Sequence, residues 1–230
     1  LGDVYKRQGS GNVVSVGGFD ADMSSTLDDL LLVSPVSDSQ SQAVISPLTT
    51  VASFMEDPTE LNALLGIDPS IDLLTTDPVA KKGTSPEYDL LYEKGNQLTV
   101  LAYSLQSTAV DSASASADAF SSITKVLEES YEETQESPNI ESKDFISDVI
   151  DQVDETTQSQ IPAERKANIA TALASVLPLI QVREGTTTNA SVLNFATTTL
   201  ISDIEKIADG TASSATVDQY DHCLLYTSDA

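Results

Sequence analysis

Apolar residues at three- and four-residue spacing dominate the later two thirds of the chain. Five such stripes follow one another, within residues 91–105, 120–131, 145–153, 169–180 and 192–207. This spacing places apolar side chains on one face of a helix. The pattern therefore predicts five long amphipathic helices, and a helical bundle is the simplest way to bury five single-sided stripes.

Three short helices are predicted before these stripes. Ser46-Pro47, Asp57-Pro58 and Asp77-Pro78 each combine an N-cap residue with a proline at the first helical position. A proline is tolerated there because its missing N–H would have no partner inside the helix. Three such starts in about thirty residues indicate short helices folded tightly on one another.

The same signals delimit the long helices. Ser85-Pro86 and Ser142 predict helix starts, Pro178 is expected to kink or end its helix early, and Gly210 is the expected stop of the last helix. Past residue 211 the periodic signal fades into polar sequence.

The first part of the chain has a different pattern. Residues 12–16, 30–33 and 43–45 are short β-prone runs separated by Gly, Asp and Ser clusters. They predict a small antiparallel sheet, or the last strands of a preceding β-module. The fold class is therefore mainly α, with a β-rich segment over residues 9–45 and a helical domain over residues 46–222.

The two ends of the chain resemble translated sequencing adapter. Residues 1–8 and residues 223–230 both match such sequence, one at each terminus and in the correct orientation. Segments of this kind are excluded from fold reasoning. We therefore expect residues 9–222 to be an internal piece of a longer reading frame. The single cysteine, Cys223, then lies outside the native part, which would have no disulfide and no thiolate ligand.

The chain is strongly acidic, with a formal net charge of −25. Such a surface repels nucleic acid and anionic lipid and can attract cations such as calcium. No stretch reaches the roughly eighteen apolar residues that a membrane helix needs. We therefore expect neither nucleic-acid binding nor direct membrane insertion.

Residue chemistry offers little for catalysis. The chain has one histidine, His222, so no histidine-based triad and no zinc site built on histidines is available. No Gly-rich phosphate loop or nucleophile elbow is present. Carboxylates are the only plentiful reactive groups, and their spacing does not indicate a paired-carboxylate hydrolase. A protein without enzymatic activity is expected.

One group of carboxylates is a candidate metal site. Asp20 and Asp22 lie on one side of an extended segment, with Asp28 and Asp29 nearby. Oxygen ligands of this kind suit calcium, although EF-hand spacing is absent. The alternative is a solvated loop, and no other cofactor is expected.

Other polar groups have simpler explanations. Asp68, Asp72 and Asp77 form a second acidic patch, in which Asp77 is most simply a helix cap. The glutamates between residues 128 and 136 form a charged helix face or a frayed end. Asn189 begins a glycosylation sequon, but it falls on a predicted helix.

Several motifs occur in a recognisable order between residues 13 and 79. Residues 13–20 read VVSVGGFD, residues 44–50 read VISPLTT, and residues 72–78 read DLLTTDP. This order resembles a module of very large secreted or surface proteins of aquatic bacteria. In those proteins the module precedes Ala-rich helices and tends to accompany β-sandwich, cadherin-like or other calcium-associated repeats.

The resemblance implies an adhesin-like, extracellular or cell-surface protein. The expected function is a structural or interaction module in adhesion or envelope display, whose partners are neighbouring domains of the same polypeptide and possible surface or protein ligands. Two alternatives stay open: a calcium-responsive binding module, and an accessory domain of a secreted enzyme whose catalytic part lies elsewhere.

Overall fold

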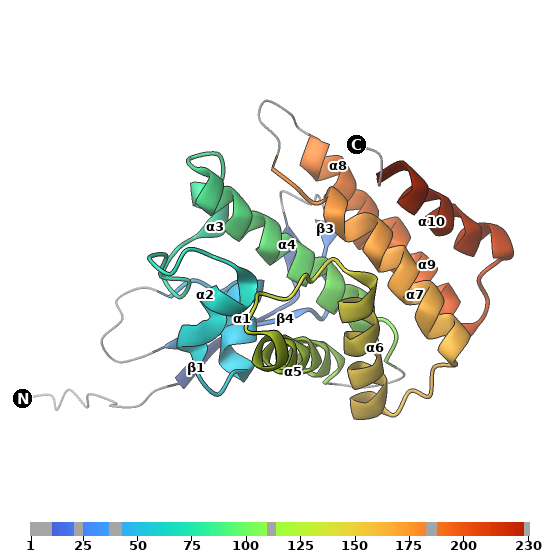
Figure 1. Ribbon diagram of the computed structural model, residues 1–230, viewed down its shortest axis with the longest axis horizontal. Helices are drawn as coiled ribbons and strands as arrows, with labels where there is room; N and C mark the ends of the chain where they lie inside the picture. The colour runs from blue at the N-terminus through green and yellow to red at the C-terminus, as the bar shows by residue number, and fades with distance from the viewer. Residues whose placement is uncertain (1–10, 21–24, 37–42, 110–113, 183–187, 228–230) are drawn as a thin grey trace, which may run out of the picture.

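The protein is mainly α-helical, with a small sheet of strands near its N-terminus (Figure 1). The computed structural model describes residues 11–20, 25–36, 43–109, 114–182 and 188–227, and for residues 19, 20, 25, 188, 189 and 221–227 it describes the backbone alone. The prediction of a helical bundle preceded by a β-strand segment is confirmed.

The strands form one long, kinked hairpin. β1 (Gly11–Val16) pairs antiparallel with β4 (Leu31–Val36), and the two-residue strands β2 (Phe19–Asp20) and β3 (Ser25–Thr26) pair further along. The kink lies at Gly17 and Gly18, which both have positive φ, a conformation that glycine adopts without steric strain. The first two predicted strands are therefore confirmed.

The third predicted strand is wrong. Residues 43–45 belong to no strand or helix, and the N–H of Val44 instead donates to the carbonyl of Leu74 at 3.2 Å. Ser46 follows at once as an N-cap, so this short apolar run leads into the first helix and lies beside a loop of the short-helix region.

The short helices begin where the Ser-Pro and Asp-Pro pairs predict. Ser46 caps α1 through a capping box with Thr49, Asp57 caps the 3₁₀ helix η1, and Asp77 caps α3. The bounds are α1 (Pro47–Phe54), η1 (Pro58–Glu60), α2 (Leu61–Leu65) and α3 (Pro78–Lys81). Gly66 ends α2 in the left-handed conformation.

The central helix of the bundle is α4 (Pro86–Gln106), which packs against α1, α5 (Ala115–Thr134) and α9 (Ile201–Asp209). The predicted stripe of α4 is buried, but burial also extends without interruption over residues 95–102. The middle of α4 is therefore enclosed on all sides, including its polar positions.

The remaining helices continue the bundle in chain order. α6 (Lys143–Thr157) packs between α5 and α7 (Ala163–Val176), and α7 packs against α9 and α10 (Ser214–Thr227). α7 ends before Pro178, where a 3₁₀ turn, η2 (Leu177–Leu179), replaces it.

The last predicted helix is interrupted by a π-helical turn. α8 (Thr188–Phe195) and α9 are joined by η3 (Ala196–Leu200), and Gly210 caps α9 in the left-handed conformation. Past residue 211, where the periodic signal fades and no further helix is predicted, α10 forms and buries Tyr220 at 2% exposure against the bundle. α10 also runs through residues 223–227, which resemble translated sequencing adapter.

One hydrophobic core runs through the molecule. Leu27 and Leu30 at the hairpin belong to the same buried cluster as Leu48 of α1, Phe120 of α5 and Ile204 of α9. Aliphatic side chains supply nearly all of it, as the sparse aromatic content of 5% requires. The inner strand of the hairpin is thus packed on the helices and is not a separate unit.

Candidate functional site

The two long edges of the β1–β4 sheet differ in whether their backbone groups have hydrogen-bond partners among the described residues, and this difference defines the candidate site. On the outer edge of β4 the N–H of Leu31 donates to Ser116 Oγ at 2.8 Å, and the N–H of Val33 donates to Thr50 Oγ1 at 2.9 Å. Thr49 Oγ1 donates to the Val33 carbonyl at 2.8 Å. Side-chain hydroxyls from α1 and α5 therefore close this edge.

Proline completes the closure of the β4 edge. Pro35 lies two residues after Val33, so its nitrogen also faces the outer edge. It has no N–H that would need a partner. β4 thus pairs with β1 on one side, and on the other side the N–H groups of Leu31 and Val33 and the carbonyl of Val33 pair with side chains, in accordance with the requirement that buried backbone groups be paired.

The hydrogen bond of Val33 also determines which groups of β1 are free. Val33 lies opposite Val14 in the antiparallel register. Opposite residues either exchange both backbone hydrogen bonds or point both sets away from each other. Because the Val33 N–H points to Thr50, the N–H and C=O of Val14 point away from β4. By alternation, those of Asn12 and Val16 do the same.

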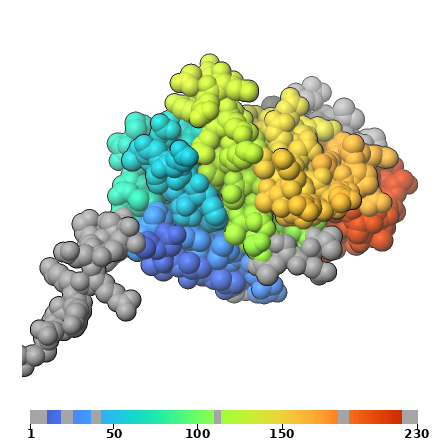
Figure 2. All heavy atoms as spheres, turned by 90° about the horizontal axis from the view of Figure 1, so that it is seen from below, coloured from blue at the N-terminus to red at the C-terminus, as the bar shows by residue number. Residues whose placement is uncertain are grey.

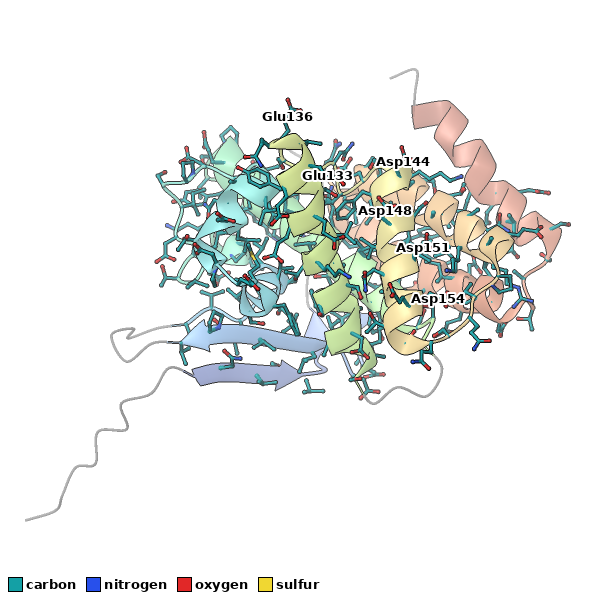
Figure 3. All side chains as sticks on the ribbon, turned by 60° about the horizontal axis from the view of Figure 1, so that its bottom comes forward. Glu133, Glu136, Asp144, Asp148, Asp151 and Asp154 are labelled. Carbon is teal, nitrogen blue, oxygen red and sulfur yellow. The ribbon has the colours of Figure 1, made fainter. Side chains whose placement is uncertain are left out.

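The free edge of β1 carries exposed apolar side chains. Val13, Val14 and Val16 are 43%, 54% and 63% exposed, and all six residues of β1 are exposed. Among the described elements β1 has substantial packing contacts only with β4. It forms the outermost strand in Figure 3 and lies with the blue N-terminal segments at one margin of the molecule in Figure 2.

Within the part of the chain that the structure describes, β1 also lacks the features that usually protect an edge strand. It contains no charged residue and no proline, although 20% of the chain is charged. Natural edge strands are commonly blunted by lysine, proline, a bulge or a covering helix. An uncovered strand with outward backbone groups is a template on which another strand can pair.

A second feature of the surface is an acidic face on α5 and α6. Glu133, Asp144, Asp148 and Asp151 lie along it, as Figure 3 shows. Glu129, Glu133, Asp148, Asp151 and Glu155 line a hollow of about 270 Å³ between the two helices. Burial, and then the negative charges of Asp151, Asp144, Glu133 and Glu129, raise the pKa of Asp148.

The acidic face is partly neutralised at its lower end. Lys166 of α7 lies 2.8 Å from Asp151 and 2.6 Å from Asp154. Burial raises the pKa of Asp154, but the hydrogen bonds from Lys166 and from the Ile161 N–H outweigh it and lower that pKa overall. Over the described residues no group of three His, Cys, Asp or Glu side chains is arranged to hold a metal ion. The net negative charge of this face repels anions.

A third feature is a polar cluster beneath the surface. Gln97 Nε2 donates to Glu141 Oε1 at 2.7 Å, Lys94 lies 3.9 Å from Glu141, and Glu93 accepts the Val182 N–H at 2.5 Å. Burial lowers the pKa of Lys94 and raises that of Glu93, and each partly buried charge is held by a neighbour.

We interpret this cluster as structural. Gln97 also lies 3.3 Å and 3.4 Å from the carbonyls of Leu177 and Ile180, so the cluster ties α4 to the turn after α7. Sequence reasoning missed it, although a glutamine between the apolar positions of α4 was a visible signal.

The predicted calcium ligands lie mostly outside the part of the chain that the structure describes. Asp20 lies at the end of β2 and its side chain is outside the described residues, as is the whole of Asp22. Asp28 and Asp29 are exposed at the turn before β4, where Asp29 has a φ of 61°. A calcium site at this end of the hairpin stays a prediction.

The other aspartates named from the sequence serve the backbone. Asp77 accepts the N–H groups of Val79 and Ala80 as a helix cap, as expected. Asp68 accepts the N–H of Ser70 and Asp72 that of Leu74. These carboxylates stabilise turns and helix starts.

The remaining polar groups named from the sequence are also placed. The glutamates between residues 128 and 136 lie mostly exposed on the last turns and the end of α5, where the helix dipole does not favour them. The side chains of Asn189 and His222 are outside the described residues.

Comparisons of the chain with protein-family models, with curated proteins and with solved structures found no match. Among the helices of the described part, none is both long and apolar enough to cross a membrane.

Proposed function

We propose that this chain is a non-enzymatic structural and interaction module of a large exported bacterial surface protein, acting in adhesion or envelope display. The observation that carries the proposal is the free edge of β1, an uncharged strand with three exposed valines and outward backbone groups. Strand addition at such an edge joins one protein unit to another through main-chain hydrogen bonds.

The segments that carry the family resemblance support the proposal, because they build the two edges of the sheet. Residues 13–20 form most of β1, the Gly17-Gly18 kink and β2. Residues 44–50 supply Ser46, which caps α1, and Thr49 and Thr50, which close the β4 edge. These motifs therefore contain both the hydroxyl side chains that pair with the outer edge of β4 and the strand β1, whose outer backbone groups point away from the sheet.

The surface charge narrows the class of partner. A chain of net charge −25 repels nucleic acids and anionic membranes over a range of about 10 Å at 0.1 M salt. The β1 edge itself is neutral. A protein strand is therefore the favoured partner.

The parent reading frame tests the setting of the module. A long sequencing read of the source DNA, extending beyond both ends of this segment, is expected to show an export signal and β-sandwich or calcium-associated repeats around residues 9–222. A neighbouring domain with a recognisable active site would instead make this chain an accessory domain of a secreted enzyme.

A broad hydrolase screen of the purified chain tests the absence of enzymatic activity. We expect no turnover of ester, glycoside, peptide or phosphate substrates. The strongest challenge would come from the polar cluster on α4: turnover that Glu93→Gln or Glu141→Gln abolished, with the fold intact by circular dichroism, would overturn the proposal.

A further inference from the structure

The outward groups of β1 have an internal symmetry. Asn12, Val14 and Val16 each direct their N–H and C=O to the free edge and are spaced two residues apart, with Val14 in the middle. An antiparallel copy of the same strand, centred on Val14, places Val14 opposite its own counterpart and Asn12 opposite Val16. In this register every outward backbone group of β1 finds a partner.

We infer that a second copy of this chain docks on the free edge of β1, forming one continuous antiparallel sheet in the order β4, β1, β1 of the second copy and β4 of the second copy. The interface is isologous, since a two-fold axis perpendicular to the sheet passes through the Val14 pair. The inference goes beyond the proposed function and does not depend on export or on the parent protein.

The side chains of β1 suit this arrangement. The Val14 pair brings two β-branched residues together on one face, and Val13 lies opposite Ser15 on the other face. The pairing places no charge opposite a like charge, because β1 contains none. Valines that are 43% to 63% exposed in one copy would bury apolar area against the other.

The shape of the molecule leaves room for the second copy. Among the described elements α1 packs on β4, whereas β1 has substantial contacts only with β4, so β1 projects from the bundle. In Figure 3 it lies on the side of β4 away from α1 and α5. Two copies joined through β1 would have their bundles separated by the four strands.

The net charge sets the conditions of the dimer. Two chains of −25 repel each other at low salt, and this repulsion fades as the Debye length falls from about 10 Å at 0.1 M to about 3 Å at 1 M. Association is therefore expected to strengthen with ionic strength.

Sedimentation velocity of the full chain tests the inference. It is run from low micromolar to near-millimolar concentration and from about 0.1 M to about 1 M sodium chloride, with a reducing agent present so that Cys223 cannot form a disulfide dimer. We expect a reversible dimer whose population rises with concentration and with salt. A monomer under all of these conditions would overturn the inference.

Two substitutions at Val14 separate strand pairing from general electrostatics. Val14→Lys adds a positive charge to an acidic chain, which would strengthen an association governed by net charge. In the Val14-centred pairing it places two lysines directly opposite each other, and we expect roughly tenfold weaker dimerisation. Val14→Thr, the matched control, keeps a β-branched uncharged residue and is expected to dimerise within about threefold of the original chain. A dimer that Val14→Lys leaves unchanged or strengthens would contradict the inference.

Amide hydrogen exchange locates the interface. On dimerisation the N–H groups of Asn12, Val14 and Val16 should become protected, whereas those of Val13 and Ser15 already bond to β4 and should change little. A dimer without this alternating protection uses another surface, and that outcome counts against the inference. Protection of the same amides in a monomeric longer parent chain would also count against the inference, because a neighbouring segment of that chain would then occupy the edge.

Discussion

β1 and β4 are strands of equal length that pair residue for residue, yet one is exposed throughout and the other is largely enclosed. In β4, Val33 is 6% exposed and Ser34 is fully buried, whereas Val14 and Val16 of β1 are 54% and 63% exposed. Both strands are rich in valine or leucine and neither carries a charge. Strand composition therefore does not explain the difference.

The difference comes from what lies beside each strand. α1 and α5 supply three hydroxyl groups to β4, and α1 packs on it, while β1 has substantial contacts within the described residues only with β4. The burial of a short strand is therefore decided by the elements packed on it. A two-stranded sheet, marginal by itself, is here held in place through one of its strands.

The largest effect should come from the core beneath α1, the helix that packs on β4. Leu48 of α1 is 1% exposed, and Leu48→Ala would leave a cavity in the core. We expect a loss of about 3 kcal/mol in the free energy of unfolding, measured by urea denaturation. Val16→Ala in β1 is the control, with an expected change below about 0.5 kcal/mol. Equal losses for the two variants would mean that Val16 of β1 is as enclosed as the core side chain Leu48.

Opening the closed edge should have the next largest effect. Thr50→Val keeps the shape of the side chain but leaves the Val33 N–H without its 2.9 Å partner. An unpaired buried donor is expected to reduce stability by about 2 kcal/mol. Thr50→Ser, which keeps the hydroxyl, should recover most of this in the same denaturation measurement. If Thr50→Val were neutral, the hydroxyl would not be what closes the edge.

A smaller effect is expected at the kink that both halves of the hairpin share. Gly17 has a φ of +65°, and a side chain there would be strained even though its Cβ would meet neighbouring atoms no closer than 3.6 Å. Gly17→Ala should lower stability by about 1 kcal/mol. Gly11→Ala, at the first residue of β1 where an added Cβ would meet no atom within 4 Å, should be nearly neutral by thermal unfolding. Similar losses at both glycines would argue against the strained kink.

The smallest effect concerns the end of the hairpin, where the sequence suggests a calcium site at Asp20 and Asp22. For a structural module without bound calcium, millimolar calcium and magnesium at equal ionic strength should shift the melting temperature equally. A larger shift with calcium, removed by Asp20→Asn, would instead support the calcium-responsive alternative through linkage between binding and folding.

Much of the fold could be predicted because the relevant signals are local. Ser46, Asp77 and Ser142 cap helices as their sequences indicate, and Gly210 ends α9 in the expected conformation. A cap requires only a side chain and the backbone of the next three residues, so its outcome hardly depends on the rest of the chain.

The errors arose where local signals are weak or are overruled by packing. Residues 43–45 are β-prone but contact the Leu74 loop, and α10 has little amphipathic signal but buries Tyr220 against the bundle. In α4 the predicted stripe is correct but incomplete, because neighbours on several sides also bury Asn96 and Gln97. Tertiary packing decides these positions, in keeping with the weak predictive power of propensity alone.

The sequence by itself determined the class of fold, the starts and stops of most helices, the two long strands and the acidic character of the surface. Only the tertiary structure decided which strand edge is closed. The hydroxyls of Thr49, Thr50 and Ser116 reach β4 from 16, 17 and 85 residues away along the chain. Periodicity and capping report on contacts within a few residues, whereas pairing of an edge depends on which distant groups the fold brings beside it. The outer edge of β1 is open because no side chain from the described part of the chain pairs with it.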